Sequence, residues 1–436
     1  MSDSTSSSEP RVPGDHALDP GSTPWPVAVV GAGAAGILAA IFAARRGARV
    51  LLLETRPVPG AKIRVSGGGR CNVLPSKASL EDFHTGGSVH ALRNILFSWP
   101  LEEVRAFFEV ELSIPLKVEA TGKVFPVSDR SQDVVAALLA ECRRAGVTLA
   151  GGSRVVRAAA IDGPDGRTFQ VETEGGPGIR CRRLVLATGG LSLPRTGSDG
   201  GGLEIARSLG HSVNATYPAL VPLVATDPGW GTLAGVSLRV GLRAVRDGRV
   251  LEEREGDFLF THRGFSGPVA LDMSRHVARP GGEATRLLAA WGGSTAPAWD
   301  DLLRAPGKRT TAHVLRASLP RRLVERLLTL AAIPEARLTS VLRREERVRL
   351  VEVLASSPLA ITGNEGYAVA EVTGGGIPLE EVTPRTLESR KTPGLHLAGE
   401  MLDTIGQIGG YNFLWAWVSG RRAGEGAAGA CAQGGR

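Results

Sequence analysis

The apolar positions of the first 200 residues form short continuous runs, separated by glycine-rich turns and by longer stretches with helical spacing. Residues 27–30 and 50–53 are uninterrupted apolar runs, as expected for buried parallel strands. The alanine-rich stretch between them predicts a helix that opens at a glycine cluster. Strands that alternate with helices indicate an α/β domain with a parallel sheet. The same criteria predict a helix at 132–145 and further strand-like runs at 116–127, 148–149, 154–159, 168–173 and 183–187.

The pattern changes near residue 195 and changes back near residue 364. Between these points the chain has short alternating strands, predicted at 220–226, 236–245, 257–261 and 287–291, and then basic helical stretches. The α/β pattern returns with a strand at 395–398 and a last helix that begins near Gly410. We therefore predict one domain split by an insertion. Its expected parts are a tail at 1–24, a first part at 25–194, an inserted domain at 195–363 and a second part at 364–430.

Three features suggest a cytoplasmic protein. Residues 1–24 are rich in Ser, Pro and Asp and have no apolar stretch, which predicts a disordered tail rather than a signal peptide. Residues 27–44 carry no charge, but they are rich in glycine and alanine, so we expect no membrane span there. The four cysteines show neither a CxxC pair nor metal-ligand spacing, which favours free thiols in a reducing compartment and no metal site.

The first glycine cluster has the features of a dinucleotide-binding turn. Gly31 permits a tight turn, Gly33 lets the backbone approach a pyrophosphate, and Gly36 lets the helix pack closely on the strand. The amides of the following helix, from Ala34 onward, point a partial positive charge at the phosphates. Glu54, eighteen residues after Gly36 at the end of the second strand, is placed to accept hydrogen bonds from ribose hydroxyls.

Three further clusters bear on which dinucleotide is bound. At 60–72, three consecutive glycines let the backbone pass close to a flat ring or a phosphate, while Lys62 and Arg70 supply positive charge. At 186–190 a strand ends in Thr188 and Gly189, a weaker signal because the same pattern forms ordinary turns. At 397–416 a strand ends in Ala-Gly-acid and leads to a glycine-opened helix, an arrangement that in flavoproteins faces the pyrimidine edge of the flavin.

The net charge of +7 is concentrated in one segment. Between Arg304 and Arg349 there are twelve Lys or Arg and four Glu, a local excess of eight. Such a segment could bind nucleic acid or an acidic partner. It also has aliphatic residues at helical spacing and no aromatic residue for stacking, which favours a solvated helical face and makes nucleic acid the less favoured partner.

These clusters together resemble the BaiN-like (YhiN-like) family of FAD-dependent oxidoreductases, some of whose members are labelled aminoacetone oxidases. The resemblance covers about residues 25 to 430. It implies an α/β Rossmann-type FAD-binding domain interrupted by a β-barrel-like and helical insertion. Its marks are SGGGRCN at 66–72, KVFPVSDRSQDVV at 123–135, ATGGLSLPRTGSDGGG at 187–202, THRGFSGPVALDMS at 261–274, EVTGGGIPLEEVTPRTLESR at 371–390 and HLAGEMLDTIGQIGGYNFLWAWVSG at 396–420.

The resemblance also implies positions for tightly bound FAD. The ADP half would lie on Gly31, Gly33, Ala34, Gly36 and Glu54, with backbone contacts from Val155 to the adenine. The flavin side would fall to Lys62, Ser66, Gly67, Arg70, Asn72, Thr188, Gly189, Gly399, Glu400, Asp403, Gly410, Tyr411 and Asn412.

The sequence leaves the reaction open. We expect an FAD-dependent enzyme that reduces a small or medium organic molecule with NAD(P)H. No second GxGxxG is present, so NAD(P)H would have to dock transiently. The alternatives are an amine oxidase that produces hydrogen peroxide and a non-catalytic flavin- or nucleic-acid-binding protein. His262 and Tyr411 are weak candidates for a proton donor, whereas His396, in a strand, is expected to be structural.

Overall fold

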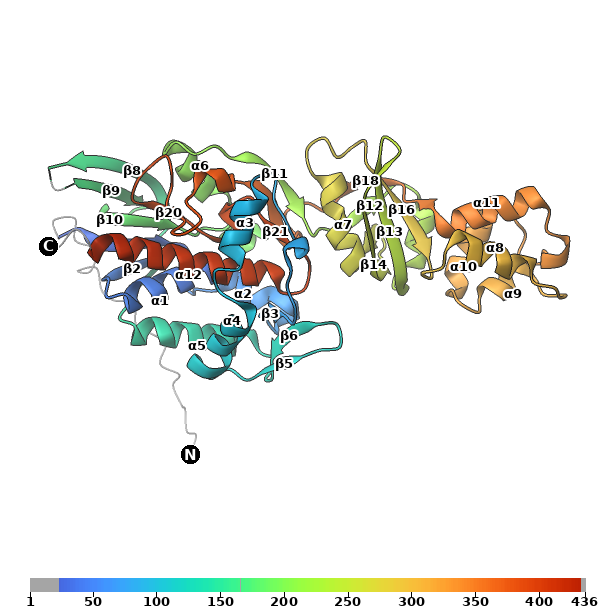
Figure 1. Cartoon of the computed structure of the whole chain (residues 1–436), viewed down its shortest axis with the longest axis horizontal. Coiled ribbons are helices and arrows are strands. Elements are labelled where there is room, and N and C mark those ends of the chain that lie inside the picture. Colours follow the sequence, from blue (N-terminus) through green and yellow to red (C-terminus); the bar gives the residue numbers. More distant parts are fainter. Residues whose placement is uncertain (1–22, 165, 433–436) are drawn as a thin grey trace, which may run out of the picture. The chain divides into compact units, whose positions relative to one another are not determined.

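The computed structural model describes residues 23–164 and 166–432 (Figure 1). Residues 1–22 of the predicted tail at 1–24 lie outside the described residues. The described chain divides into two compact units. The first contains the residues up to Thr216 and those from Gly375 onward, and the second contains Tyr217–Gly374.

The first unit is built on a seven-stranded sheet. Its strand order is β7-β2-β1-β10-β9-β8, with β20 beside the C-terminal half of β10. Strands β7, β2, β1, β10 and β20 are parallel, and β9 and β8 add an antiparallel edge. The strands are β1 (Trp25–Val30), β2 (Val50–Glu54), β7 (Thr148–Gly151), β8 (Val155–Gly163), β9 (Gly166–Thr173), β10 (Ile179–Leu186) and β20 (Leu395–Leu397).

The predicted strands of this sheet exist within a few residues of the expected ends. Strands β1 and β2 are almost entirely buried, as their continuous apolar runs require. The predicted helix at 132–145 is α5 (Ser131–Arg144), and the last helix is α12 (Tyr411–Ala432). The other helices of the unit are α1 (Ala34–Arg45), α2 (Ala61–Val65), α3 (Val89–Leu96), α4 (Leu101–Ala106) and α6 (Gly201–Ser208). Two small sheets complete it, β3 (Leu74–Pro75) with β6 (Lys123–Pro126) and β5 (Leu116–Val118), and β4 (Phe83–His84) with β21 (Ile405–Gly406).

Helices α1 and α12 lie against each other through very small residues (Figure 1). A Cβ on Gly420 would lie 2.3 Å from the backbone oxygen of Ala35, and one on Gly424 would lie 2.1 Å from that of Ala39. The two helix backbones therefore touch, and any side chain at these glycines would separate them.

The second unit contains an antiparallel sheet that closes on itself. Its strand order is β17-β16-β13-β14-β15-β12-β18. The outermost strands, β17 and β18, are separated by two residues in the chain, so the two edges of the sheet must meet. This is a barrel-like sheet. The strands are β12 (Leu223–Ala225), β13 (Ser237–Arg246), β14 (Arg249–Phe260), β15 (Gly264–Ser266), β16 (Arg286–Trp291), β17 (Ser357–Pro358) and β18 (Ile361–Asn364).

The second unit has its own core and its own helices. Large aromatic side chains fill it, with Trp230, Trp291 and Phe260 packed at ring-centroid distances of 5.7 to 5.8 Å. Helix α7 (Pro268–Ala278) packs on the strands. The remaining helices are α8 (Ala296–Arg304), α9 (Thr311–Leu315), α10 (Arg321–Leu330) and α11 (Arg344–Ala355).

Candidate cofactor-binding site

The parallel strands of the first unit deliver most of the predicted residues to one edge of the sheet. Val30 is paired with both Leu53 and Leu186, and Leu186 is paired with Leu397. The carboxyl ends of β1, β2, β10 and β20 are therefore level. The glycine turn after β1, Glu54, the 187–190 segment and the 398–400 segment all leave the sheet there, where open α/β sheets bind ligands.

The three fingerprint glycines occupy three different environments. Gly31 has φ +98°, and a Cβ there would lie 2.6 Å from the Ala187 carbonyl oxygen. A Cβ on Gly36 would lie 1.7 Å from the carbonyl oxygen of Gly31. At Gly33, by contrast, no atom lies within 4 Å of the Cβ position, and no side chain caps the helix that begins at Ala34. The turn thus leaves open space in front of uncapped amides, as a dinucleotide pyrophosphate requires.

Glu54 lies beside this turn. Its carboxylate accepts hydrogen bonds from the backbone N–H of Ala32 at 2.7 Å and from that of Arg56 at 2.8 Å. Burial raises the pKa of Glu54, and these hydrogen bonds oppose that rise. Its carbonyl oxygen accepts from Ser153 N at 2.8 Å, and Val155 begins β8 two residues later. Glu54 and Val155 are therefore near each other at the same edge.

Lys62, Ser192 and Glu400 form a hydrogen-bonded triad from three distant segments. The Lys62 ammonium donates to Glu400 Oε2 at 2.7 Å and to Ser192 Oγ at 2.8 Å, and Ser192 Oγ donates to Glu400 Oε1 at 2.6 Å. Ser192 is fully buried. Ser192 is not among the predicted site residues, because nothing in its local sequence indicates a polar role.

The SGGGRCN loop has an unusual backbone. Gly67, Gly68 and Gly69 have φ values of +55°, +69° and +86°, which side chains rarely tolerate. The space at Gly68 and Gly69 is open, while a Cβ on Gly67 would lie 3.0 Å from the backbone N of Asn72. Ser66 Oγ donates to the Ile63 carbonyl at 2.8 Å, which closes helix α2. The glycines thus expose bare backbone beside Lys62.

Arg70 pairs with side chains outside this loop, and Cys71 is buried. Arg70 donates to Glu119 Oε1 at 2.6 Å, and its guanidinium lies 4.0 Å from the centre of the Phe125 ring. It therefore contacts the β5–β6 region rather than Lys62 and Glu400. Cys71 is buried, and burial raises the pKa of its thiol to about 12. A thiol that keeps its proton does not react as a thiolate.

The residues at the start of α12 contact the end of the SGGGRCN loop. With its side-chain amide turned so that both neighbours are satisfied, Asn72 donates to the Leu74 carbonyl at 3.1 Å and accepts from Gly410 N at 3.0 Å. Gly410 has φ +98°, and a Cβ there would lie 2.4 Å from the Leu74 carbonyl carbon. Asn412 holds the preceding turn through Gly406, donating to its oxygen at 2.9 Å and accepting from its nitrogen at 2.8 Å. Tyr411 lies between Gly410 and Asn412 in the chain. Its ring packs edge to face against Phe83, with a ring-centroid distance of 5.8 Å.

Asp403 is buried and occupied by structural hydrogen bonds. It accepts from Asn214 Nδ2 at 2.8 Å and from the backbone N–H of Gly86. Burial raises the pKa of Asp403, opposed by these two bonds. Asn214 was not selected from the sequence, although it fixes a carboxylate that was.

The 187–190 segment and the turn at Gly399 complete the edge. Thr188 Oγ1 donates to Met401 Sδ at 3.2 Å, and Gly189 has φ +76°. Gly399 has φ +74° and accepts at its oxygen from Trp415 Nε1 at 3.0 Å. Trp415 and Trp417 are buried core residues.

The two histidines considered from the sequence lie in different units. His262 lies in an exposed turn between β14 and β15 of the second unit, so it is not among the residues that the sheet edge brings together. His396 is buried in β20 and bonds through Nδ1 to the Thr386 carbonyl at 2.9 Å. Burial lowers the pKa of His396 to about 4, as expected of a neutral core histidine.

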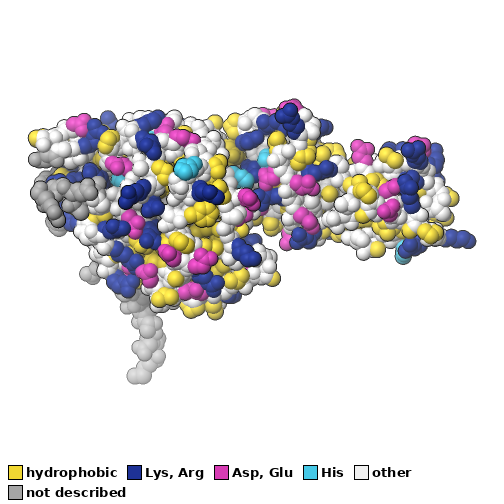
Figure 2. Space-filling model, in the orientation of Figure 1, with side chains coloured by type: hydrophobic (Ala, Val, Ile, Leu, Met, Phe, Trp, Pro, Cys, Tyr) yellow, Lys and Arg dark blue, Asp and Glu magenta, His cyan; other side chains and the backbone are white. Residues whose placement is uncertain are grey.

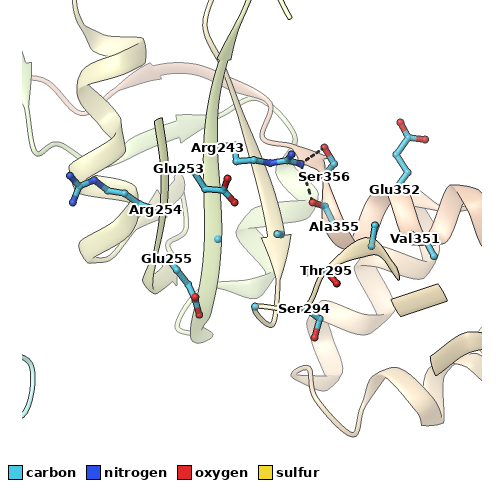
Figure 3. Close-up of a pocket in the computed structure, with 14 residues that line it drawn as sticks. Arg243, Glu253, Arg254, Glu255, Ser294, Thr295, Val351, Glu352, Ala355 and Ser356 are labelled. Carbon is cyan, nitrogen blue, oxygen red and sulfur yellow. Dashed lines mark hydrogen bonds between the residues drawn. The ribbon is translucent and has the colours of Figure 1, made fainter. Parts of the chain in front are cut away.

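The second unit has a hollow of its own, about 520 Å³ in volume, between the strands of the barrel-like sheet and α11 (Figure 3). Arg243 crosses one side of it and donates to Ser356 Oγ at 3.0 Å and to the Ala355 carbonyl at 3.3 Å. Glu253 and Glu352 also line it. None of the residues predicted to bind a cofactor lies in this hollow.

Two kinds of site are absent from the described residues. No helix there is long and apolar enough to cross a membrane. The uncharged stretch 27–44 is divided between β1 and α1. In the same part of the chain, no group of three or more His, Cys, Asp or Glu side chains is arranged to hold a metal ion.

Comparison with known proteins adds relatives over nearly the whole chain. The ribosomal RNA dihydrouridine synthase of Escherichia coli K12 is 35% identical over 90% of this chain and 95% of its own length. The 3-dehydro-bile acid delta(4,6)-reductase of Clostridium scindens is 33% identical over 92% of this chain and 98% of its own. A solved 3-ketosteroid-delta4-(5alpha)-dehydrogenase of Rhodococcus jostii RHA1 has 18% identity and a TM-score of 0.46, over 93% of this chain and 96% of that chain.

A family match covers most of the described structure. Residues 25–426 match the family described as HI0933-like protein Rossmann domain. The predicted α/β fold with a Rossmann-type FAD-binding domain is confirmed, and so is the resemblance to BaiN-like (YhiN-like) proteins. The chain belongs to the HI0933-like Rossmann family of FAD-dependent oxidoreductases.

Proposed function

We propose that this protein uses FAD to add two hydrogens across a carbonyl-conjugated C=C bond, and that its substrate is uracil in ribosomal RNA. The observation that carries this proposal is the 35% identity to a ribosomal RNA dihydrouridine synthase over 90% of the chain. Dihydrouridine differs from uridine by two hydrogens across the C5=C6 bond, which is conjugated to the C4 carbonyl. The double bonds named in the delta(4,6)-reductase relative are conjugated to a ketone in the same way. Both relatives therefore support one chemistry on two kinds of molecule.

The first unit supplies a site that suits FAD. The open space at Gly33, the uncapped start of α1 and the bare backbone at Gly68 and Gly69 are cradles that a Cβ or a capping side chain would fill. We place the ADP half on Gly31, Gly33, Ala34, Gly36, Glu54 and Val155. We place the flavin half near Lys62, Ser66, Gly67, Asn72, Thr188, Gly189, Gly399, Glu400, Gly410, Tyr411 and Asn412. Arg70 and Asp403 support this half indirectly, through Glu119 and Phe125 and through Asn214.

When bound, FAD supplies the two electrons of the reduction. The chain contributes charge and position. The N-terminus of α12 carries a partial positive charge that favours negative charge at the pyrimidine edge of the ring. The Lys62 ammonium, held by Glu400 and Ser192, adds a fixed cation. NAD(P)H would be the electron donor, docking transiently, and Tyr411 is the candidate in this unit for the proton that completes the addition.

The test is product analysis. Holoenzyme, NADH or NADPH, and ribosomal RNA transcribed in vitro are incubated together, and the RNA is then digested for mass spectrometry of nucleosides. The proposal expects a uridine that has gained two hydrogens. Conversion of a 3-keto-4,6-diene steroid without any change in the RNA would reassign the substrate. Hydrogen peroxide formed from aminoacetone in air, with no reduction of either acceptor, would favour the amine oxidase instead.

A further inference from the structure

We infer that an RNA-binding surface lies on the helical part of the second unit, at the α8–α9 turn and the start of α11. This inference rests on the proposed RNA substrate and adds where the RNA backbone is held. We call the surface the basic face and define it by Lys308, Arg309 and Arg344, with Arg343 beside them. The ligand class is base-paired RNA, recognised through its phosphates.

The charge of the protein is concentrated in this region. Residues 304–349 carry an excess of eight positive charges, whereas the whole chain carries +7, so the rest is close to neutral. Figure 2 shows Lys and Arg side chains gathered over α11 and the adjoining helices. A local excess of this kind attracts a polyanion over roughly a Debye length of about 8 Å at physiological salt.

Many arginines of the segment make ion pairs, two arginines to each carboxylate. Arg316 and Arg321 pair with Glu325, Arg337 and Arg343 with Glu346, and Arg304 and Arg347 with Asp300. These ion pairs connect the helices of the segment to one another. Much of the segment is therefore a solvated helical face.

Two further arginines of the segment, Arg322 and Arg349, donate to backbone carbonyls, and three cations have neither kind of partner among the described residues. Within the described part of the chain, Lys308, Arg309 and Arg344 make no ion pair, and all three are exposed. Arg344 is the first residue of α11, where the helix dipole disfavours a positive charge. A positive charge at this position does not stabilise the helix, but it can bind a phosphate of the RNA.

The backbone brings these cations to one end of the helical part. Thr339 N donates to the Arg309 carbonyl at 3.0 Å, and Thr310 forms a β-bridge with Leu338. The 308–309 turn therefore runs beside the segment that enters α11 at Arg344. Buried leucines, including Leu323, hold the helices beneath it, so the charges sit on a rigid support.

The composition of the segment indicates which RNA it suits. Single-stranded RNA is usually held by aromatic side chains that stack on the bases, and residues 304–349 contain no Phe, Tyr or Trp. Base-paired RNA is recognised mainly through its shape and phosphates, for which arginine and lysine suffice. The hollow of Figure 3 is not part of this surface, because Glu253, Glu255 and Glu352 line it.

The test is RNA binding by full-length holoenzyme with oxidised flavin and no NAD(P)H. The probes are a base-paired RNA hairpin and an unpaired RNA of equal length, both fluorescently labelled. The variant combines Lys308→Gln, Arg309→Gln and Arg344→Gln. Its matched control combines Arg93→Gln, Arg143→Gln and Arg180→Gln in the first unit, which removes the same charge from exposed arginines that have no ion pair among the described residues.

We expect the basic-face variant to bind the hairpin at least tenfold more weakly and to lower the slope of log K against log salt by about three. The control should bind as the parent does, and both variants should retain FAD. Equal binding by the basic-face variant, equal weakening by the control, or no hairpin binding by the parent would each overturn the inference. Because no reduction occurs in this assay, its outcome is independent of the nucleoside analysis that tests the proposed function.

Discussion

The fingerprint glycines show how a single residue can serve either the fold or a ligand. Gly36 is fixed by the fold, since a Cβ there would lie 1.7 Å from the oxygen of Gly31. Gly33 has φ −83° and empty space beside it, so the fold does not require glycine at this position. The lack of a side chain at Gly33 is therefore explained by a bound ligand and not by packing within the chain.

Gly33→Val and Gly36→Ala should therefore fail in different ways. Gly33→Val should fold with a melting temperature close to that of the parent and lose FAD, because its side chain fills the space in front of the α1 amides. Gly36→Ala should be destabilised by about 1–3 kcal/mol through overpacking. The flavin-to-protein absorbance ratio and thermal unfolding separate the two effects. Retention of FAD by Gly33→Val would show that the pyrophosphate is placed wrongly.

His396 provides a pH prediction at the same scale. Burial lowers its pKa from 6.5 to about 4, so between these values the unfolded chain binds more protons than the folded chain. Its contribution to the free energy of unfolding is thus complete above about pH 6.5 and is lost as the pH falls toward 4, by about 3 kcal/mol in all. His396→Leu should remove this part of the acid sensitivity in urea unfolding, whereas His90→Leu at an exposed site should not. Parallel pH profiles for the parent and His396→Leu would contradict this account.

At the residue scale, sequence reasoning found motif residues and missed their partners. Lys62 and Glu400 stand in recognisable clusters, but Ser192 bonds to them across separations of 130 and 208 residues. Asp403 was assigned to the flavin from its motif, and the structure gives it Asn214 and Gly86 as partners. Such long-range hydrogen bonds depend on tertiary structure, which a single sequence does not display.

At the scale of elements, helices α1 and α12 determine whether the site exists. Both begin at the proposed FAD site, and their backbones touch through Ala35, Ala39, Gly420 and Gly424. The sequence predicted both helices but gave no sign that these glycines face α1. Strand β14 also differs, since it begins at Arg249 and not at residue 257. Its first half contains the consecutive charged residues 252–255, which pair with β13 and do not resemble a buried strand in the sequence.

The α1–α12 contact can be tested on a single helix. Gly424→Ala should be destabilised by about 1–3 kcal/mol, because its Cβ would lie 2.1 Å from the Ala39 oxygen. Gly429→Ala is the matched control, since no atom lies within 4 Å of its Cβ position and alanine favours helix by about 1 kcal/mol. Thermal unfolding should place the two variants on opposite sides of the parent. A neutral Gly424→Ala would mean that the helices are not in backbone contact.

At the scale of the whole molecule, the sequence predicts an inserted domain at 195–363. The structure divides the chain at Thr216 and Gly375. The first difference arises because α6 (Gly201–Ser208) buries Leu203 and Ile205 in the core of the first unit. The net charge is likewise uneven, because residues 304–349 of the second unit carry an excess of eight positive charges.

The proposed function requires that bound FAD carry electrons from NAD(P)H to a conjugated C=C bond in ribosomal RNA. Anaerobic spectroscopy of the purified holoenzyme tests it most directly. NADH or NADPH should bleach the flavin absorption, and ribosomal RNA transcribed in vitro should then restore it without oxygen. A flavin that NAD(P)H does not bleach, or a bleached flavin that only oxygen restores, would contradict the account.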